Sequence, residues 1–144
     1  MRLTSPAFAS GETIPVRHTC DGADVSPPLS IEDIPETAVC LALIMDDPDR
    51  PAGTWDHWVA YDIAVRHGVP QGVGSLGTPG HNSWRRAGYG GPCPPTGEHR
   101  YYFRVYALDA RLGLPEGTGK EPVLKAMKGH ILAEAILMGR YSRR

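Results

Sequence analysis

Residues 88–108, GYGGPCPPTGEHRYYFRVYAL, decide how the rest of the chain is arranged. The first half is largely glycine and proline, which interrupt regular structure, so we expect a stiff loop there. The second half is aromatic and β-branched and predicts a strand that begins near His99. Alternation along this strand places His99 and Tyr101 at the end of an otherwise apolar face. Two polar groups at the rim of a buried face indicate a pocket.

Length and composition predict a single domain over residues 1–144, with a mainly β fold. The chain has 17 glycines and 14 prolines, which is typical of a structure rich in turns. Its 15 basic and 16 acidic residues nearly cancel, which argues against a nucleic-acid partner held by bulk charge. No apolar run reaches the roughly 18 residues of a membrane helix, so we expect no stable membrane insertion.

Three cysteines are present, Cys20, Cys40 and Cys93, and none belongs to a CxxC pair. The odd number, together with the absence of a visible secretion signal at the start of the sequence, predicts reduced thiols and a cytoplasmic protein.

Two further strands flank the same site. The continuous apolar run 39–45 predicts a central, fully buried strand, which ends in the acidic segment that contains Asp47. A second strand begins with His57 and continues to about residue 65. If this strand and the strand that begins near His99 both pair antiparallel with the central strand, the end of the central strand lies beside the starts of the other two. The side chains expected to meet at this edge are Asp47, His57, His99 and Tyr101.

The last part of the chain carries a helical pattern. Apolar residues recur at spacings of three and four from Val123 to Met138, and Gly139 is typical of a helix end. We therefore expect a C-terminal helix there. The glycine-rich residues 66–91 are expected to form an ordered loop, packed through Trp84 and Tyr89.

Four kinds of site compete for these residues. In a small-anion pocket the imidazoles and the Tyr101 hydroxyl would donate to the ligand, and the N–H groups near Gly90 and Gly91 would add donors. Asp47 would orient or partly charge His57. We favour this reading.

The three alternatives fit the pattern less well. A metal site could use two histidines and a carboxylate, but the usual ligand spacings are absent, so we expect no metal. A Cys93 thiolate with His99 as base is weakened by the prolines on either side of the cysteine. Both histidines could also be buried residues with a purely structural role.

The ordered motifs resemble the phosphatidylethanolamine-binding protein family, in its bacterial and archaeal, Raf kinase inhibitor-like branch. They are Asp47-Pro48-Asp49-Arg50-Pro51, His57-Trp58 and the run from Gly91 to Tyr101, with weaker matches at 20–29 and 129–141. The resemblance implies a large central antiparallel sheet, a smaller second sheet and peripheral helices. It also implies an anion pocket at one end of the large sheet.

Carried over by position, the resemblance assigns the pocket to seven residues, with two more in support. The pocket residues are Asp47, His57, Gly91, Pro92, Cys93, His99 and Tyr101, and the supporting residues are Asp49 and Arg100. We expect a non-enzymatic, regulatory module that needs no cofactor. It would bind phosphate or phosphoethanolamine. The alternatives are a protease or kinase inhibitor that acts through its surface and, less favoured, a Cys/His or metal-dependent enzyme. A homodimer is implied by the resemblance only.

Overall fold

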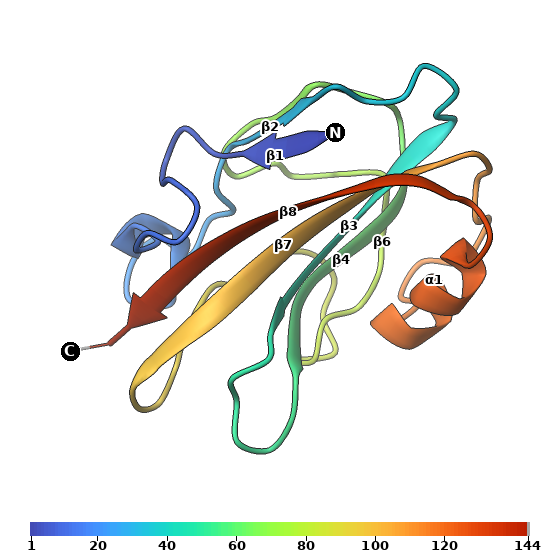
Figure 1. Cartoon of the computed structure of the whole chain (residues 1–144). Coiled ribbons are helices and arrows are strands. Elements are labelled where there is room, and N and C mark those ends of the chain that lie inside the picture. Colours follow the sequence, from blue (N-terminus) through green and yellow to red (C-terminus); the bar gives the residue numbers. More distant parts are fainter. Residues whose placement is uncertain (144) are drawn as a thin grey trace.

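The computed structural model describes residues 1–143, which form two antiparallel sheets and one α-helix (Figure 1). In chain order the elements are β1 (Arg2–Thr4), the 3₁₀ helix η1 (Val16–His18), β2 (Leu29–Glu32), β3 (Cys40–Asp47), β4 (Trp55–Ile63), β5 (Gly68–Val69), β6 (Thr78–Pro79), β7 (Glu98–Leu108), α1 (Lys120–Met127) and β8 (Ile131–Ser142).

The large sheet has the strand order β6-β4-β3-β7-β8, and the small sheet has the order β1-β2-β5. Strand β3 lies between β4 and β7 and is antiparallel to both. Each of its residues is buried, as its continuous apolar sequence predicts. The predicted mainly β fold with a large and a smaller sheet is therefore confirmed.

Two apolar cores lie on opposite faces of the large sheet. One core fills the space between the two sheets, and its members include Leu3, Leu43 and Phe103. The other core lies under α1, which covers Ile44 and Tyr61. In β7 the buried positions alternate from His99 to Val105, as the period-two pattern predicts, and the strand is buried on both faces from there to Leu108. No helix within residues 1–143 is long and apolar enough to cross a membrane.

The prediction of a C-terminal helix up to Met138 is wrong. The helix ends at Met127, and Gly129 follows with a φ of 83°, a conformation that ends helices. Residues 131–142 form β8, which pairs with β7 along its length, from Ile131 against Leu108 to Ser142 against Glu98. This long ladder outweighs the helical propensity of leucine, alanine and glutamate in the segment.

The prediction of three reduced cysteines is also wrong. Cys20 and Cys93 form a disulfide across a sequence separation of 73 residues, and only Cys40, which is buried, is free. The pairing joins the loop after η1 to the loop before β7. Because disulfides persist in oxidising compartments and also inside some hyperthermophiles, the cysteines no longer support a cytoplasmic location, which stays a prediction.

Gly139 is required where β8 crosses the N-terminal segment. A Cβ atom at this position would lie 2.5 Å from Ile14 Cγ1 and 2.8 Å from Phe8 Cε2. We expect Gly139→Ala to lower the free energy of unfolding by about 1–3 kcal/mol through overpacking. Gly74→Ala is the control, because a Cβ there meets nothing within 4 Å. Urea denaturation that finds the two variants equally stable would contradict this account.

The disulfide is expected to stabilise the fold by restricting the unfolded chain. Replacing both cysteines, in Cys20→Ala/Cys93→Ala, should lower the free energy of unfolding by about 2–4 kcal/mol. Added dithiothreitol should destabilise the parent protein and leave the double variant unaffected. Thiol titration of the denatured, unreduced parent should find one free thiol, that of Cys40. Three free thiols would overturn the assignment.

Candidate functional site

A cavity of about 340 Å³ opens at the edge of the large sheet where β3 ends and β4 and β7 begin. Loops from three other parts of the chain complete its walls. The residues that line it are Cys20, Asp24, Asp47, Arg50, Trp55, His57, Trp84, Arg86, Gly90, Gly91, Cys93, Pro94, Pro95 and His99. The antiparallel pairing inferred from sequence does bring the predicted acidic and imidazole side chains to one place.

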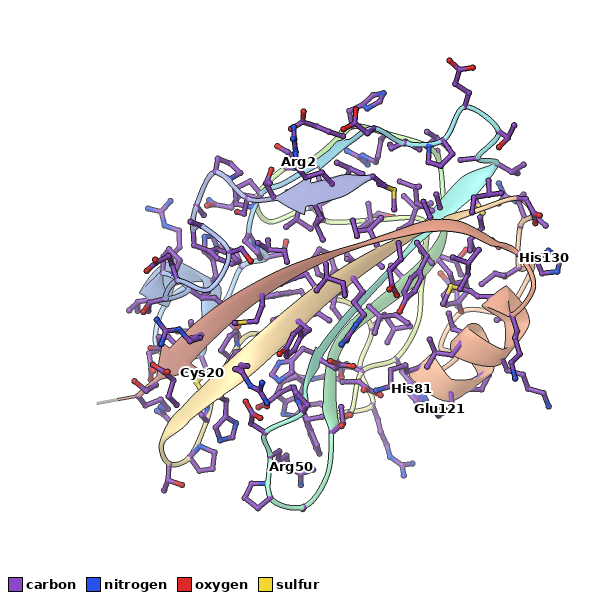
Figure 2. The ribbon with its side chains drawn as sticks, viewed as in Figure 1. Arg2, Cys20, Arg50, His81, Glu121 and His130 are labelled. Atoms are coloured by element: carbon purple, nitrogen blue, oxygen red, sulfur yellow. A yellow bond between two sulfur atoms is a disulfide. The ribbon has the colours of Figure 1, made fainter. Side chains whose placement is uncertain are left out.

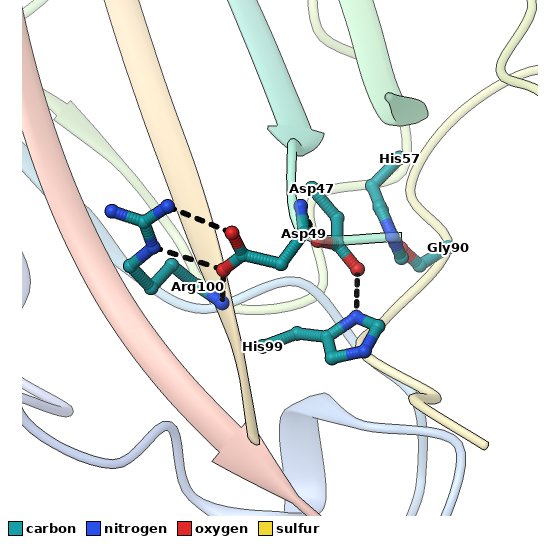
Figure 3. A network of polar contacts seen from close by, with 6 residues as sticks. All are labelled: Asp47, Asp49, His57, Gly90, His99 and Arg100. Atoms are coloured by element: carbon teal, nitrogen blue, oxygen red, sulfur yellow. Dashed lines mark hydrogen bonds and ion pairs between the residues drawn. The ribbon is translucent and has the colours of Figure 1, made fainter. Parts of the chain in front are cut away.

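Asp47 and His99 form a buried hydrogen-bonded pair in the cavity (Figure 3). The distance from His99 Nδ1 to Asp47 Oδ2 is 2.6 Å, and both side chains are less than a tenth exposed. The second carboxylate oxygen, Oδ1, accepts the backbone N–H of Asp49 at 2.8 Å. Because a carboxylate can only accept, His99 Nδ1 carries the hydrogen and the imidazole orientation is fixed.

His57 is held by the backbone instead. Its Nδ1 lies 2.7 Å from the carbonyl oxygen of Gly90, and since a carbonyl only accepts, Nδ1 donates. In the neutral ring Nε2 is then an acceptor, and it becomes a donor only when the ring is protonated. Burial lowers the pKa of His57 below 6.5, although the Gly90 carbonyl and the Asp47 charge oppose that shift.

Tyr101 lies behind the two imidazoles and is completely buried. Its ring meets the His57 ring edge-on, with centroids 5.2 Å apart, and is stacked against the His99 ring at 6.4 Å. Burial and the Asp47 carboxylate raise the pKa of its phenol, so the hydroxyl stays protonated. Tyr101 thus supports the imidazoles rather than lining the cavity.

Asp49 and Arg100 brace the loop that leaves β3, outside the cavity (Figure 3). Arg100 Nη2 and Nε donate to the two carboxylate oxygens of Asp49 at 2.7 and 2.9 Å, and the backbone N–H of Arg100 adds a third bond at 2.8 Å. This paired geometry fixes the start of β7 against the end of β3.

The Cys20–Cys93 disulfide joins two loops at the cavity wall, and hydrogen bonds also hold these loops together. The N–H of Gly91 donates to Asp24 Oδ1 at 2.8 Å, the N–H of Cys20 donates to the carbonyl of Pro92 at 3.1 Å, and Tyr89 Oη donates to the carbonyl of His18 at 2.6 Å. Figure 2 shows Cys20 at this end of the molecule, away from His130 beside α1.

Two details predicted for the site are wrong, and one alternative loses its basis. Asp47 orients His99 and not His57 by a hydrogen bond, although its charge does raise the pKa of His57, as the other half of that prediction has it. The N–H of Gly90 donates to the carbonyl of His57 and that of Gly91 to Asp24, so both are already used. Cys93 is part of a disulfide, which removes the thiolate that a nucleophilic role would need.

Of the seven predicted pocket residues, five line the cavity and two do not. Asp47, His57, Gly91, Cys93 and His99 form the lining, whereas Pro92 and Tyr101 do not reach it. Within residues 1–143, no group of three histidine, cysteine or acidic side chains has the arrangement of a metal site.

The sequence did not reveal that Trp55 and Trp84 form part of the cavity wall. Trp84 packs on His57 with ring centroids 5.0 Å apart and on Trp55 at 5.5 Å, both edge-on. A Cβ on Gly90 would lie only 2.3 Å from the Trp84 ring, so glycine is required there. The two tryptophans were visible in the sequence, but their meeting depends on the path of residues 80–90, which no local pattern predicts.

The Asp49–Arg100 pair beside the cavity can be tested through the titration of the Asp49 carboxyl group. The hydrogen bonds from Arg100 lower the pKa of Asp49 from 3.8 to about 2. Arg100→Gln should return this pKa toward 3.8, as read from carboxyl carbon NMR shifts. The contribution of Asp49 to stability is complete above its unfolded pKa and is lost as pH falls through about 2. Arg2→Gln, which breaks the Arg2–Glu32 pair in the small sheet, should not move Asp49; an unchanged pKa in Arg100→Gln would contradict the pairing.

Comparison with known proteins gives a consistent result. Residues 4–142 match the family model described as "Phosphatidylethanolamine-binding protein". A UPF0098 protein from Methanothermobacter thermautotrophicus is 48% identical, with 99% of each chain covered. The crystal structure of a putative phosphatidylethanolamine-binding protein homologue from Chlamydia trachomatis is 44% identical, has a TM-score of 0.96, and covers 99% of this chain and 97% of its own. The Escherichia coli protein YbcL, described as a member of the mammalian family, is 27% identical with a TM-score of 0.91, over 99% and 98% of the chains. The chain therefore belongs to the phosphatidylethanolamine-binding protein family.

Proposed function

We propose that the chain is a non-catalytic module that binds a small oxyanion, such as phosphate or a phosphorylated headgroup, between His57 and His99. The observation that carries the proposal is the shared state of the two imidazoles. Each lines the cavity, and each has its Nδ1 fixed on a protein acceptor, the carbonyl of Gly90 or the carboxylate of Asp47. Within residues 1–143 neither Nε2 has a protein hydrogen bond, so both are available to a ligand.

Protonation turns this pair of acceptors into a pair of donors. A fully ionised oxyanion has no hydrogen to give, so it needs N–H groups at both Nε2 positions. His57 is neutral near pH 7 because burial lowers its pKa. Binding of a fully ionised anion should therefore be coupled to the uptake of a proton at His57.

The negative charge of Asp47 has a defined role in this arrangement. Its carboxylate accepts a hydrogen bond from His99 Nδ1 at 2.6 Å, so it holds this imidazole in place at the cavity wall. The family description names a phosphate-bearing headgroup, which agrees with an oxyanion in this cavity. Phosphate and a phosphorylated headgroup share the phosphoryl group, and this is the group that would bind between the imidazoles.

Sulfate tests the proposal, because its charge does not change between pH 5 and pH 8. We expect its affinity, measured by calorimetry, to fall at least about tenfold as pH rises from 5 to 8, since the anion needs protonated imidazoles as donors. His57→Gln and His99→Gln should each weaken binding by about tenfold or more, the value of one hydrogen bond to a charged group.

His130→Gln is the matched control. His130 also donates from Nδ1 to a carboxylate, Asp109 at 2.8 Å, but it lies outside the cavity. This variant should bind sulfate as the parent does. Circular dichroism should establish that every variant is folded. Affinity that is flat with pH, or equal losses in all three variants, would contradict the proposed site.

A further inference from the structure

The cavity mouth carries two guanidinium groups, those of Arg50 and Arg86, which the site between the imidazoles does not use. Within residues 1–143 neither forms an ion pair with a carboxylate. Each therefore keeps its N–H donors available for a group outside the protein.

Arg50 is held in place by stacking. Its guanidinium carbon lies 4.2 Å from the centre of the Trp55 ring, and the residue is half-buried in the loop after β3. Figure 2 shows it at the end of the sheet that also carries Cys20. Stacking uses the face of the guanidinium plane and leaves the N–H groups at its edge free to donate.

Arg86 is exposed, but its backbone is fixed by Asn82. Asn82 Oδ1 accepts the N–H of Trp84 at 3.0 Å and that of Arg86 at 3.2 Å, while its Nδ2 donates to the carbonyl of Gly88 at 3.1 Å. The Asn82 N–H also donates to the Arg86 carbonyl at 2.9 Å. Since Asn82 is itself buried, one side chain positions both Trp84 and Arg86 at the cavity.

An aromatic wall connects the two ends of the site. From His57 the ring contacts run to Trp84 at 5.0 Å and from there to Trp55 at 5.5 Å, on which Arg50 is stacked. A ligand held by the imidazoles therefore has an apolar wall of edge-on rings beside it that leads toward the guanidinium groups. Such a surface suits an apolar or aromatic body between two polar ends.

Carboxylates also line the cavity, so the binding of an anion there needs the positive charge of these arginines. Asp24 and Asp47 contribute two carboxylates, and the imidazole of His57 is neutral near pH 7. Without Arg50 and Arg86 the cavity would present negative charge to an anion, which opposes binding. The two guanidinium groups offset that charge at the mouth.

We propose that Arg50 and Arg86 form a second anion subsite, so that the ligand is a phosphate monoester whose organic part carries a second anionic group. This inference rests on the proposed function, since the phosphoryl group occupies the site between the imidazoles. The second group is a carboxylate or a phosphate, which a guanidinium recognises with paired hydrogen bonds.

Three probes separate the two subsites: phenyl phosphate, 4-carboxyphenyl phosphate and 4-carbamoylphenyl phosphate. The acid and the amide have the same size, so their affinity ratio isolates the second charge. At pH 7 we expect the parent protein to bind the acid at least about fivefold more tightly than the amide. The amide and phenyl phosphate should bind with similar affinity.

Arg50→Gln and Arg86→Gln should each lower the acid-to-amide ratio, and the double variant should bring it close to one. Arg85→Gln is the matched control, because it removes the same charge from the adjacent exposed position, which does not line the cavity. In this control the ratio should stay at the parent value.

The outcomes distinguish the two claims. A ratio near one in the parent, or an unchanged ratio in the double variant, overturns the second subsite even if phenyl phosphate binds and depends on His57 and His99. A loss in Arg85→Gln as large as in Arg86→Gln also overturns it, because the effect would be general charge. If none of the probes binds the parent at 10 mM, a concentration of about 100 times the 0.1 mM expected for a modest site, both claims fail.

Discussion

The antiparallel pairing of β3 with a strand on each side is the constraint on which the rest of the structure depends. Because both neighbours run against it, the end of β3 lies beside the starts of β4 and β7. Three strands, of which β7 is distant in the sequence from the other two, thus deliver an acid and two imidazoles to a single sheet edge: Asp47, His57 and His99. The buried sheet supplies the rigidity, and the side chains at its edge supply the chemistry.

Hydrogen bonds to fixed acceptors then give the site its geometry. His99 is held by Asp47, and His57 is held by the backbone of the loop that contains Gly90. That loop is in turn fixed by the disulfide, by the Asp24 carboxylate and by the packing of Trp84 on Gly90. Pre-organisation of this kind reduces the cost of ordering side chains when a ligand binds.

Sequence patterns predicted the three central strands of the large sheet, β4, β3 and β7, because these strands bury one or both faces. The alternation that begins at His99 and the continuous apolar run of β3 both translate directly into burial. The segment 131–142 was mistaken for a helix, because its residues favour helices locally and only the ladder with β7 makes them a strand. The local sequence pattern contains no information about the pairing of this segment with β7.

Several site features depend on contacts between distant loops and were beyond sequence reasoning. The partner of Cys20 is 73 residues away, and the choice of His99 rather than His57 for Asp47 depends on the exact geometry of the sheet edge. Arg86 reaches the cavity only because Asn82 folds its loop back. The family resemblance identified the positions of the imidazoles and the acid but not these hydrogen bonds.

Selenate gives the most direct test of the central claim, because it mimics sulfate and phosphate and can be located by anomalous diffraction. Crystals soaked in selenate near pH 5 should show an anomalous peak within hydrogen-bonding distance of Nε2 of both His57 and His99. Selenate bound elsewhere while this cavity holds only water would contradict the account.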